Sequence, residues 1–194
     1  MTFKQLFYDW NGLNVALFKA INHATPDWLG PFAHFGSILG NYWGGPFLLI
    51  ALLIWSWHLN TATQPAMSAL AVRIQAQRFM LGFVLTFLTV ALLKLLVDFP
   101  RPMVVLPGMV RVIGEPELQY SFPSWHAAYT MLVVVTLWPL VTHRLRALLV
   151  VLLVWMGWSR IAVGAHFPAD VLAGFLIGGV LAGTARFVTT RHWF

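Results

Sequence analysis

Long apolar runs constrain the fold of this chain more than any other feature of its sequence. A transmembrane helix needs roughly 17–25 mainly apolar residues, and five stretches meet that requirement: 41–57, 79–97, 124–142, 147–165 and 168–186. Only 9% of the residues are charged, whereas soluble domains carry about a quarter. The runs are continuous rather than alternating, which is typical of membrane helices. The sequence therefore predicts an all-α integral membrane helical bundle with five to six transmembrane helices.

The first forty residues are less regular than the rest. An amphipathic stretch covers 3–24, and Pro26 and Pro31 precede a stretch without Asp, Glu, Lys or Arg. This pattern predicts interfacial or partly inserted helices and leaves room for the sixth span. We therefore divide the chain into an N-terminal segment, 1–40, and a transmembrane core, 41–194.

Basic residues predict the orientation of the chain. The connections 58–78 and 143–146 and the tail from 186 carry arginines without acids. They alternate with the connections 98–123 and 165–168, so the positive-inside rule places the arginine-bearing set in the cytoplasm. The other set then faces the periplasm or exterior of a bacterial inner (plasma) membrane.

Composition also argues against two kinds of site. Cysteine is absent, which excludes disulfides, a thiolate nucleophile and a thiolate metal site. The net charge is +6, but the cations are scattered over loops instead of forming a basic stripe, so no nucleic-acid partner is expected. The lipid bilayer is the expected partner, and the sequence gives no indication of oligomeric state.

Three fragments place ionisable side chains where apolar runs meet loops, all on the predicted outer face. They are Lys94-x6-Arg101-Pro102, Pro123-Ser124-Trp125-His126 and Ser159-Arg160-x5-His166-x3-Asp170. Ionisable groups are costly in a bilayer and are seldom kept there without a function. Histidines, one acid and three cations are the groups that a metal-free phosphoryl-transfer site needs.

Lys94 and Arg101 are candidates for binding phosphate. If the helix continues past Lys94, the two residues lie about two turns apart on the same side. Arginine binds phosphate through its planar fork and lysine as a point charge. The structural alternative is a lysine that pairs with Asp98, four residues further on.

The 98–123 connection is rich in proline and glycine, so regular helix is not expected there. It carries Glu115 and Glu117. We interpret both as solvated loop charges, with the rim of an entrance as the alternative.

Ser124 is predicted to be the N-cap of the third apolar helix. The free N–H groups of a helix N-terminus bind anions, and His126 in the first turn is placed to protonate a leaving oxygen. The alternative is an ordinary capped helix with an interfacial histidine.

The last fragment is the most specific of the three. Asp170 follows His166 by one turn, so its carboxylate can bond one imidazole nitrogen and leave the other free. That arrangement suits a nucleophile with its orienting group, here an imidazole that attacks phosphorus. Arg160 lies near the outer end of the preceding run. The remaining histidines match no motif and are interpreted as interfacial or loop residues: His23, His34, His58, His143 and His192.

Together the fragments resemble the type-2 phosphatidate phosphatase superfamily, whose signature is K-x6-RP, PSGH and SR-x5-H-x3-D. One departure is that Trp125 stands where the family usually has glycine. Tryptophan keeps the backbone N–H at this position, so we expect no loss of activity. The indole should narrow the pocket or contact the lipid.

The resemblance implies a role for each residue of the motifs. His166 attacks phosphorus, Asp170 orients it, and His126 protonates the leaving lipid oxygen and later activates water. The phosphate-binding set is Lys94, Arg101, Ser124, Trp125 and Arg160. No metal and no cofactor are implied.

The expected function is hydrolysis of a membrane lipid phosphate, with undecaprenyl diphosphate preferred. Phosphatidylglycerophosphate, phosphatidate and lipid A phosphate are the other candidate substrates. Two alternatives stay open: a phosphotransferase that passes the phosphate to another lipid, and a non-catalytic membrane scaffold or transporter. Transporters often show paired internal repeats, and none is visible here.

Overall fold

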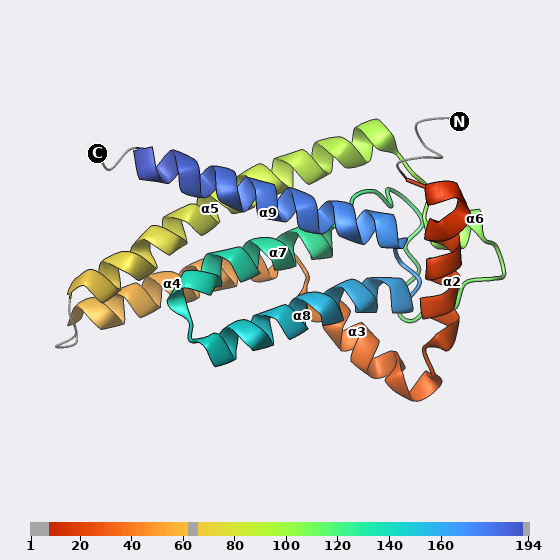
Figure 1. Ribbon diagram of the computed structural model, residues 1–194, viewed down its shortest axis with the longest axis horizontal. Coiled ribbons are helices and arrows are strands. Elements are labelled where there is room, and N and C mark those ends of the chain that lie inside the picture. The colour runs from red at the N-terminus through yellow and green to blue at the C-terminus, as the bar shows by residue number, and fades with distance from the viewer. Residues whose placement is uncertain (1–7, 62–65, 192–194) are drawn as a thin grey trace.

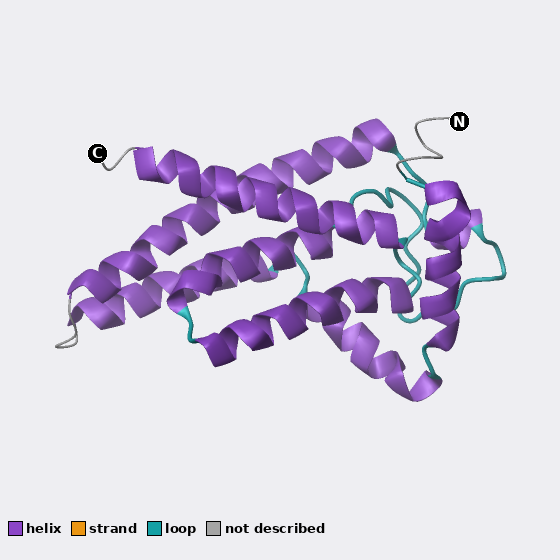
Figure 2. Cartoon of the chain, viewed as in Figure 1, coloured by secondary structure: helices purple, strands orange, loops and turns teal. Residues whose placement is uncertain are grey.

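The computed structural model describes residues 8–61 and 66–191, and every regular element in these ranges is a helix (Figures 1 and 2). The longer helices are α2 (Leu13–Ala24), α3 (Gly30–Leu39), α4 (Gly44–Thr61), α5 (Ala66–Val97), α7 (Trp125–Leu137), α8 (His143–Ala162) and α9 (Pro168–Arg191). The short ones are η1 (Trp10–Gly12), η2 (Asp27–Leu29), α6 (Pro102–Val105) and η3 (Trp138–Leu140). The expected all-helical architecture is confirmed.

Helix α7 lies at the centre of the bundle and packs against α5, α8 and α9. Two glycines allow the close approach of α9: a Cβ at Gly174 would lie 2.5 Å from the carbonyl oxygen of Ser124, and one at Gly178 would lie 2.2 Å from that of Ala128. Small residues spaced four apart commonly let membrane helices pack backbone to backbone. This contact fixes the start of α7 beside the start of α9.

Within the part of the chain that the structure describes, three stretches are long and apolar enough to cross a membrane: Ser68–Val105, His143–Ala162 and Pro168–Thr190. The pair Asp27–Leu39 and Gly44–Thr61, bent by 63°, meets the same criteria together. Helix α7 and its 3-10 extension are apolar but shorter. Large apolar side chains such as Leu96 and Leu176 remain exposed on the outside of the bundle, as expected for surfaces that face lipid.

The connection expected at 58–78 is mostly helix. Helix α5 begins at Ala66, well before the expected start at residue 79, and has 32 residues. Its first turns contain alanine, glutamine and arginine, which are good helix formers although they are not all apolar. The apolar run at 79–97 therefore predicted the second half of α5, but it did not predict that the helix begins at Ala66.

The N-terminal helices pack on the same end of the bundle as the loops of the sequence motifs. Helix α2 contacts α8 and α9, and α3 contacts α8; Figure 1 shows α2 lying across the ends of the other helices. Residues 3–7 of the expected amphipathic stretch lie outside the described residues. The division of the chain at residue 40 stays a prediction.

Candidate active site

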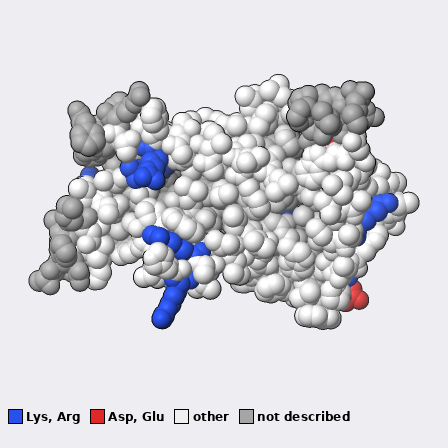
Figure 3. Space-filling model, in the orientation of Figure 1, with Lys and Arg blue, Asp and Glu red and all other residues white. Residues whose placement is uncertain are grey.

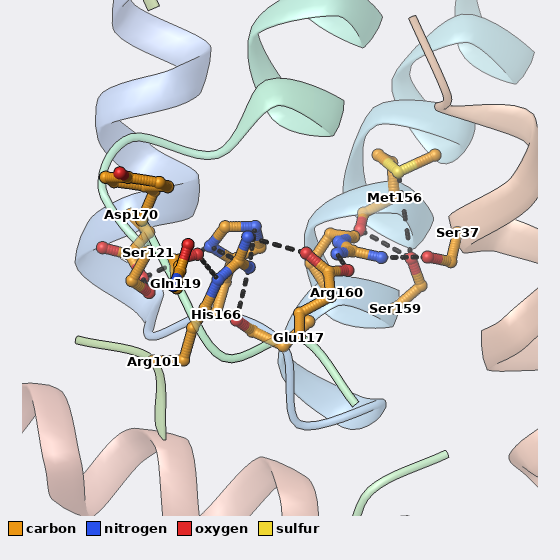
Figure 4. Close-up of polar contacts among 12 residues, drawn as sticks. Ser37, Arg101, Glu117, Gln119, Ser121, Met156, Ser159, Arg160, His166 and Asp170 are labelled. Carbon is orange, nitrogen blue, oxygen red and sulfur yellow. Dashed lines mark hydrogen bonds and ion pairs between the residues drawn. The ribbon is translucent and has the colours of Figure 1, made fainter. Parts of the chain in front are cut away.

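Residues of all three sequence fragments meet at one end of the bundle: Arg101 donates to the carbonyl oxygen of Ala165, and the backbone N–H of Ser124 donates to that of Asp170. Figure 4 shows Arg101, Arg160, His166 and Asp170 there. Helix α8 ends at Ala162, and Gly164, with φ of +83°, reverses the chain. The backbone N–H groups of Ala165 and His166 each donate to the carbonyl oxygen of Arg160, at 3.1 Å. Pro168 then starts α9. The turn therefore places His166 directly beside the end of α8 and the first turn of α9.

His166 is 1% exposed and lies between a carboxylate and a guanidinium. Its Nδ1 is 3.4 Å from Asp170 Oδ2, and its Nε2 is 2.8 Å from Arg101 NH1. Because a guanidinium only donates, this network favours the tautomer with the proton on Nδ1 and a lone pair on Nε2. Burial, reinforced by the charges of Arg101 and Arg160, lowers the pKa of His166 well below its ordinary range. The ring is therefore neutral at neutral pH.

Asp170 is fully buried and accepts hydrogen bonds on both oxygens. Oδ2 accepts from the Ser121 hydroxyl at 2.5 Å and from the Phe167 backbone N–H at 2.9 Å, and Oδ1 accepts from the Tyr8 hydroxyl at 2.9 Å. These donors hold the carboxylate in one orientation beside the imidazole.

Tyr8 and Ser121 were not among the candidates from the sequence. Each stands far from Asp170 in the chain and belongs to no motif. Burial, followed by the Asp170 charge, raises the pKa of Tyr8, so its hydroxyl keeps the proton that it donates. From α2, Asn14 Oδ1 accepts the backbone N–H of Ala169 at 3.0 Å. The N-terminal segment therefore supports the first turn of α9 directly.

Arg101 and Arg160 are both buried, with exposures of 6% and 2%. Arg101 Nε donates to the carbonyl oxygen of Gln119 at 2.8 Å, and its NH1 donates to that of Ala165 at 2.8 Å. Arg160 NH1 donates to the Ser37 hydroxyl, while its buried Nε has no partner. Both guanidinium groups are thus held by fixed neighbours.

Lys94 lies in the same region, but not through the helical continuation to Arg101 that the sequence predicted. Helix α5 ends at Val97 and the chain turns at Asp98, whose φ is +40°, so no continuous helix joins Lys94 to Arg101. The Nζ of Lys94 donates to the carbonyl oxygen of Tyr120 instead of pairing with Asp98. The structural alternative for this lysine is wrong.

Ser124 occupies the N-cap position of α7 as expected, but its side chain makes no capping bond. Its hydroxyl is buried without a partner, and its backbone N–H donates to the carbonyl oxygen of Asp170 at 3.0 Å. The indole of Trp125 packs against Tyr42 and Phe87, with ring centroids 5.5 and 5.0 Å away.

A cavity of about 240 Å³ opens beside these groups and is lined in part by His126, Arg160 and Glu117. Its far wall comes from the region of α3, with His34, Ser37, Ile38 and Asn41. These residues were not among the candidates from the sequence. Positions 34, 37, 38 and 41 follow the spacing of one helix face, which is the signal that could have identified them.

Glu117 is not a solvated loop charge, so that interpretation is wrong. Its Oε2 is 2.6 Å from Arg101 NH2, and its Oε1 is 2.5 Å from Arg160 NH2. The long loop folds back over the helix ends and brings these charges together. No local sequence pattern predicts this contact. Glu115 lines the same cavity.

Within the described ranges, no three His, Asp or Glu side chains gather in a way that could hold a metal ion. The arrangement offers instead a neutral imidazole fixed by a carboxylate, with two guanidinium groups and an ammonium nearby. Such a group of residues can attack an anionic centre and stabilise the charge that develops on it.

Comparisons with known proteins agree on one family. The family model "PAP2 superfamily" matches residues 75–193. The Escherichia coli (strain K12) protein "Putative undecaprenyl-diphosphatase YbjG" is 32% identical over 91% of this chain and 82% of its own length. A Rhizobium etli "Lipid A 1-phosphatase" is 39% identical, but the match covers 37% of this chain and only 30% of that protein. The crystal structure of Aquifex aeolicus LpxE superposes with a TM-score of 0.76 at 28% identity, over 89% of this chain and 94% of that one.

Proposed function

The chain belongs to the PAP2 superfamily of membrane lipid phosphatases, and from this premise we propose that it hydrolyses undecaprenyl diphosphate through a phosphohistidine intermediate on His166. The observation that carries the proposal is the position of the neutral His166 ring. Nδ1 faces Asp170, and Nε2 lies beside a guanidinium group that can bind phosphate.

In the proposed first step, Nε2 of His166 attacks phosphorus while the bond from phosphorus to the leaving lipid oxygen breaks. His126 gives a proton to that oxygen. Asp170 stabilises the positive charge that develops on the imidazole. In the second step, His126 takes a proton from water as the water oxygen attacks phosphorus and the P–N bond breaks, which releases inorganic phosphate.

Five residues are assigned to the phosphate oxygens. Arg101, Arg160 and Lys94 would offset the charge of the transition state, because preorganised cations in a dry site stabilise it most effectively. Ser124, whose buried hydroxyl has no partner, and the backbone N–H of Trp125 would bind further oxygens at the start of α7.

We propose that this chemistry needs no metal ion. Activity should then persist in EDTA, and vanadate, which can mimic a five-coordinate phosphoryl centre, should inhibit. Strong sensitivity to the chelator would contradict the proposal.

We also propose that the site faces the periplasm or exterior. Figure 3 shows several blue Lys and Arg side chains toward the left of the view, where α5 begins and α9 ends in Figure 1. The arginines near the start of α5, the start of α8 and the end of α9 are Arg73, Arg78, Arg144, Arg146 and Arg186, and none of the six acidic residues of the chain lies at these helix ends. The positive-inside rule supports a cytoplasmic position for the arginine end.

Undecaprenyl diphosphate is preferred because the match with YbjG extends over most of both chains. The similarity to the Rhizobium etli lipid A 1-phosphatase, 39% identical over 37% of this chain, makes lipid A phosphate the second candidate. The test is phosphate release by the purified protein from undecaprenyl diphosphate, lipid A, phosphatidylglycerophosphate and phosphatidate. The highest kcat/KM should be found with undecaprenyl diphosphate. A higher value for lipid A would transfer the assignment to that substrate, and no release from any of them would contradict the proposed function.

A further inference from the structure

The carboxylate of Glu117 lies where the proposed mechanism needs a phosphate. Its two oxygens contact the terminal NH2 groups of Arg101 and Arg160, one oxygen to each arginine, as Figure 4 shows. Two adjacent phosphate oxygens can bridge a pair of guanidinium groups in the same way. The resting site therefore already holds an anion that belongs to the protein.

Most of the other guanidinium nitrogens of the two arginines already have partners within the protein. In Arg101, Nε and NH1 are engaged by backbone carbonyl oxygens and by the His166 ring. In Arg160, NH1 contacts the Ser37 hydroxyl, and Nε is the nitrogen without a partner. A phosphate that takes the position between the two terminal NH2 groups must displace Glu117.

The same carboxylate lines the cavity, whereas the proposed nucleophile does not. Glu117, His126 and Arg160 belong to the cavity wall, whereas His166 is not part of that wall and is 1% exposed. A lipid phosphate in the cavity would meet Glu117 before it met the imidazole.

Glu117 is the member of this ion-pair cluster that can leave. Its side chain is 39% exposed, against 7% for Arg101 and 3% for Arg160, and it stands on an irregular loop after Gly114 and Pro116. Burial works to raise the pKa of Glu117, but the charges of Arg160 and Arg101 outweigh it and lower the pKa. The side chain is therefore an anion at neutral pH and competes with phosphate under working conditions.

We propose that Glu117 is an internal competitor for the phosphate-binding position. An incoming lipid phosphate displaces it, and its return expels the inorganic phosphate that hydrolysis leaves behind. The assignment of Arg101 and Arg160 to the phosphate rests on the proposed function. Between turnovers Glu117 also neutralises two buried cations that would otherwise repel each other.

The test is the dissociation constant of inorganic phosphate for the full-length protein in detergent, measured by isothermal titration calorimetry. The variants are Glu117→Gln and the matched control Glu115→Gln, which removes the same charge from the same cavity. Glu117→Gln should bind phosphate about tenfold to a hundredfold more tightly, since one charge-assisted contact is typically worth that factor. Glu115→Gln should change the constant by less than about threefold.

Unchanged or weaker binding by Glu117→Gln would overturn the proposal, because a residue that only positions the arginines would lower phosphate affinity when lost. Equal tightening in both variants would also overturn it, since the effect would then be general electrostatics. No detectable binding to either wild type or Glu117→Gln would count against it as well. The measurement needs no turnover, so it separates this proposal from the lipid assignment. In assays with a hydrolysed lipid, KM and the inhibition constant of phosphate should fall by the same factor in Glu117→Gln.

Discussion

Arginines stand at both ends of the helix bundle, and their surroundings differ. At the site end, Arg101 and Arg160 are buried and contact Glu117. At the opposite end, Arg144 and Arg186 are exposed, and Arg146 lies over the Trp138 ring at 5.5 Å. The difference shows that the number of charges at a membrane boundary does not identify a binding site. Burial with fixed partners does, because a desolvated cation must be compensated by a neighbour or by a ligand.

The largest difference between the two ends should come from their histidines. His166→Ala should reduce kcat at least about a thousandfold, since loss of a nucleophile removes the covalent route. His143→Ala, at the exposed start of α8, should leave kcat within about twofold. Phosphate release by both purified variants measures this. A His166→Ala protein with near wild-type turnover would place the chemistry elsewhere.

The second largest difference between the two ends should come from replacing an arginine by lysine. Arg160→Lys should lower kcat/KM about a hundredfold, because a lysine cannot reproduce the planar fork that reaches two partners at once. Arg146→Lys, at the other end, should cost less than about twofold. Steady-state kinetics on the two variants measure the contrast. Similar losses in both would mean that the burial of Arg160 has no catalytic meaning.

Loss of the hydrogen bond that Tyr8, in the N-terminal segment, donates to Asp170 should reduce activity less than the two changes above. Tyr8→Phe removes one hydrogen bond to Asp170 and should lower kcat about fivefold to twentyfold with little change in KM, since the hydroxyl orients a group that acts in the transition state. Tyr42→Phe, in the aromatic cluster beside Trp125, is the control. A change in KM alone would indicate that Tyr8 shapes the lipid path instead.

The smallest effect concerns stability at mildly acid pH. The pKa of His166 is lowered in the folded protein, whereas in the unfolded chain it is about 6.5. Below that value the unfolded state binds a proton that the folded state does not, so stability falls as pH falls, by at most about 1.4 kcal/mol per pH unit. His166→Gln should therefore lose less stability than wild type between pH 7 and pH 5 in thermal unfolding. Equal losses would mean that the ring titrates normally.

The parts of the site that the sequence predicted are those with fixed local spacing. His166 and Asp170 are four residues apart across one turn, and Ser124 and His126 share the first turn of a helix, so local geometry suffices to relate them. Apolar runs likewise identified the helices, although they missed the polar beginning of α5. The resemblance to a family then supplied roles that spacing alone does not.

The parts that the sequence missed depend on contacts between distant residues. Glu117 is 43 residues from Arg160, and Tyr8 is 162 residues from Asp170. Ser37 and His34 line the cavity because α3 packs on α8. Nothing in the local sequence distinguishes such residues from solvated loop charges or interfacial side chains. Only the packing of the helix ends brings them to the site.

The most direct test of the account is to trap the phosphoenzyme. Wild-type protein mixed with lipid substrate labelled in the terminal phosphate and quenched within milliseconds should carry the label, stable to base and labile to acid as a P–N bond is. Mass spectrometry should locate it on His166, and the His166→Ala variant should carry none. Label on His126, or rapid turnover without any labelled protein, would contradict the account.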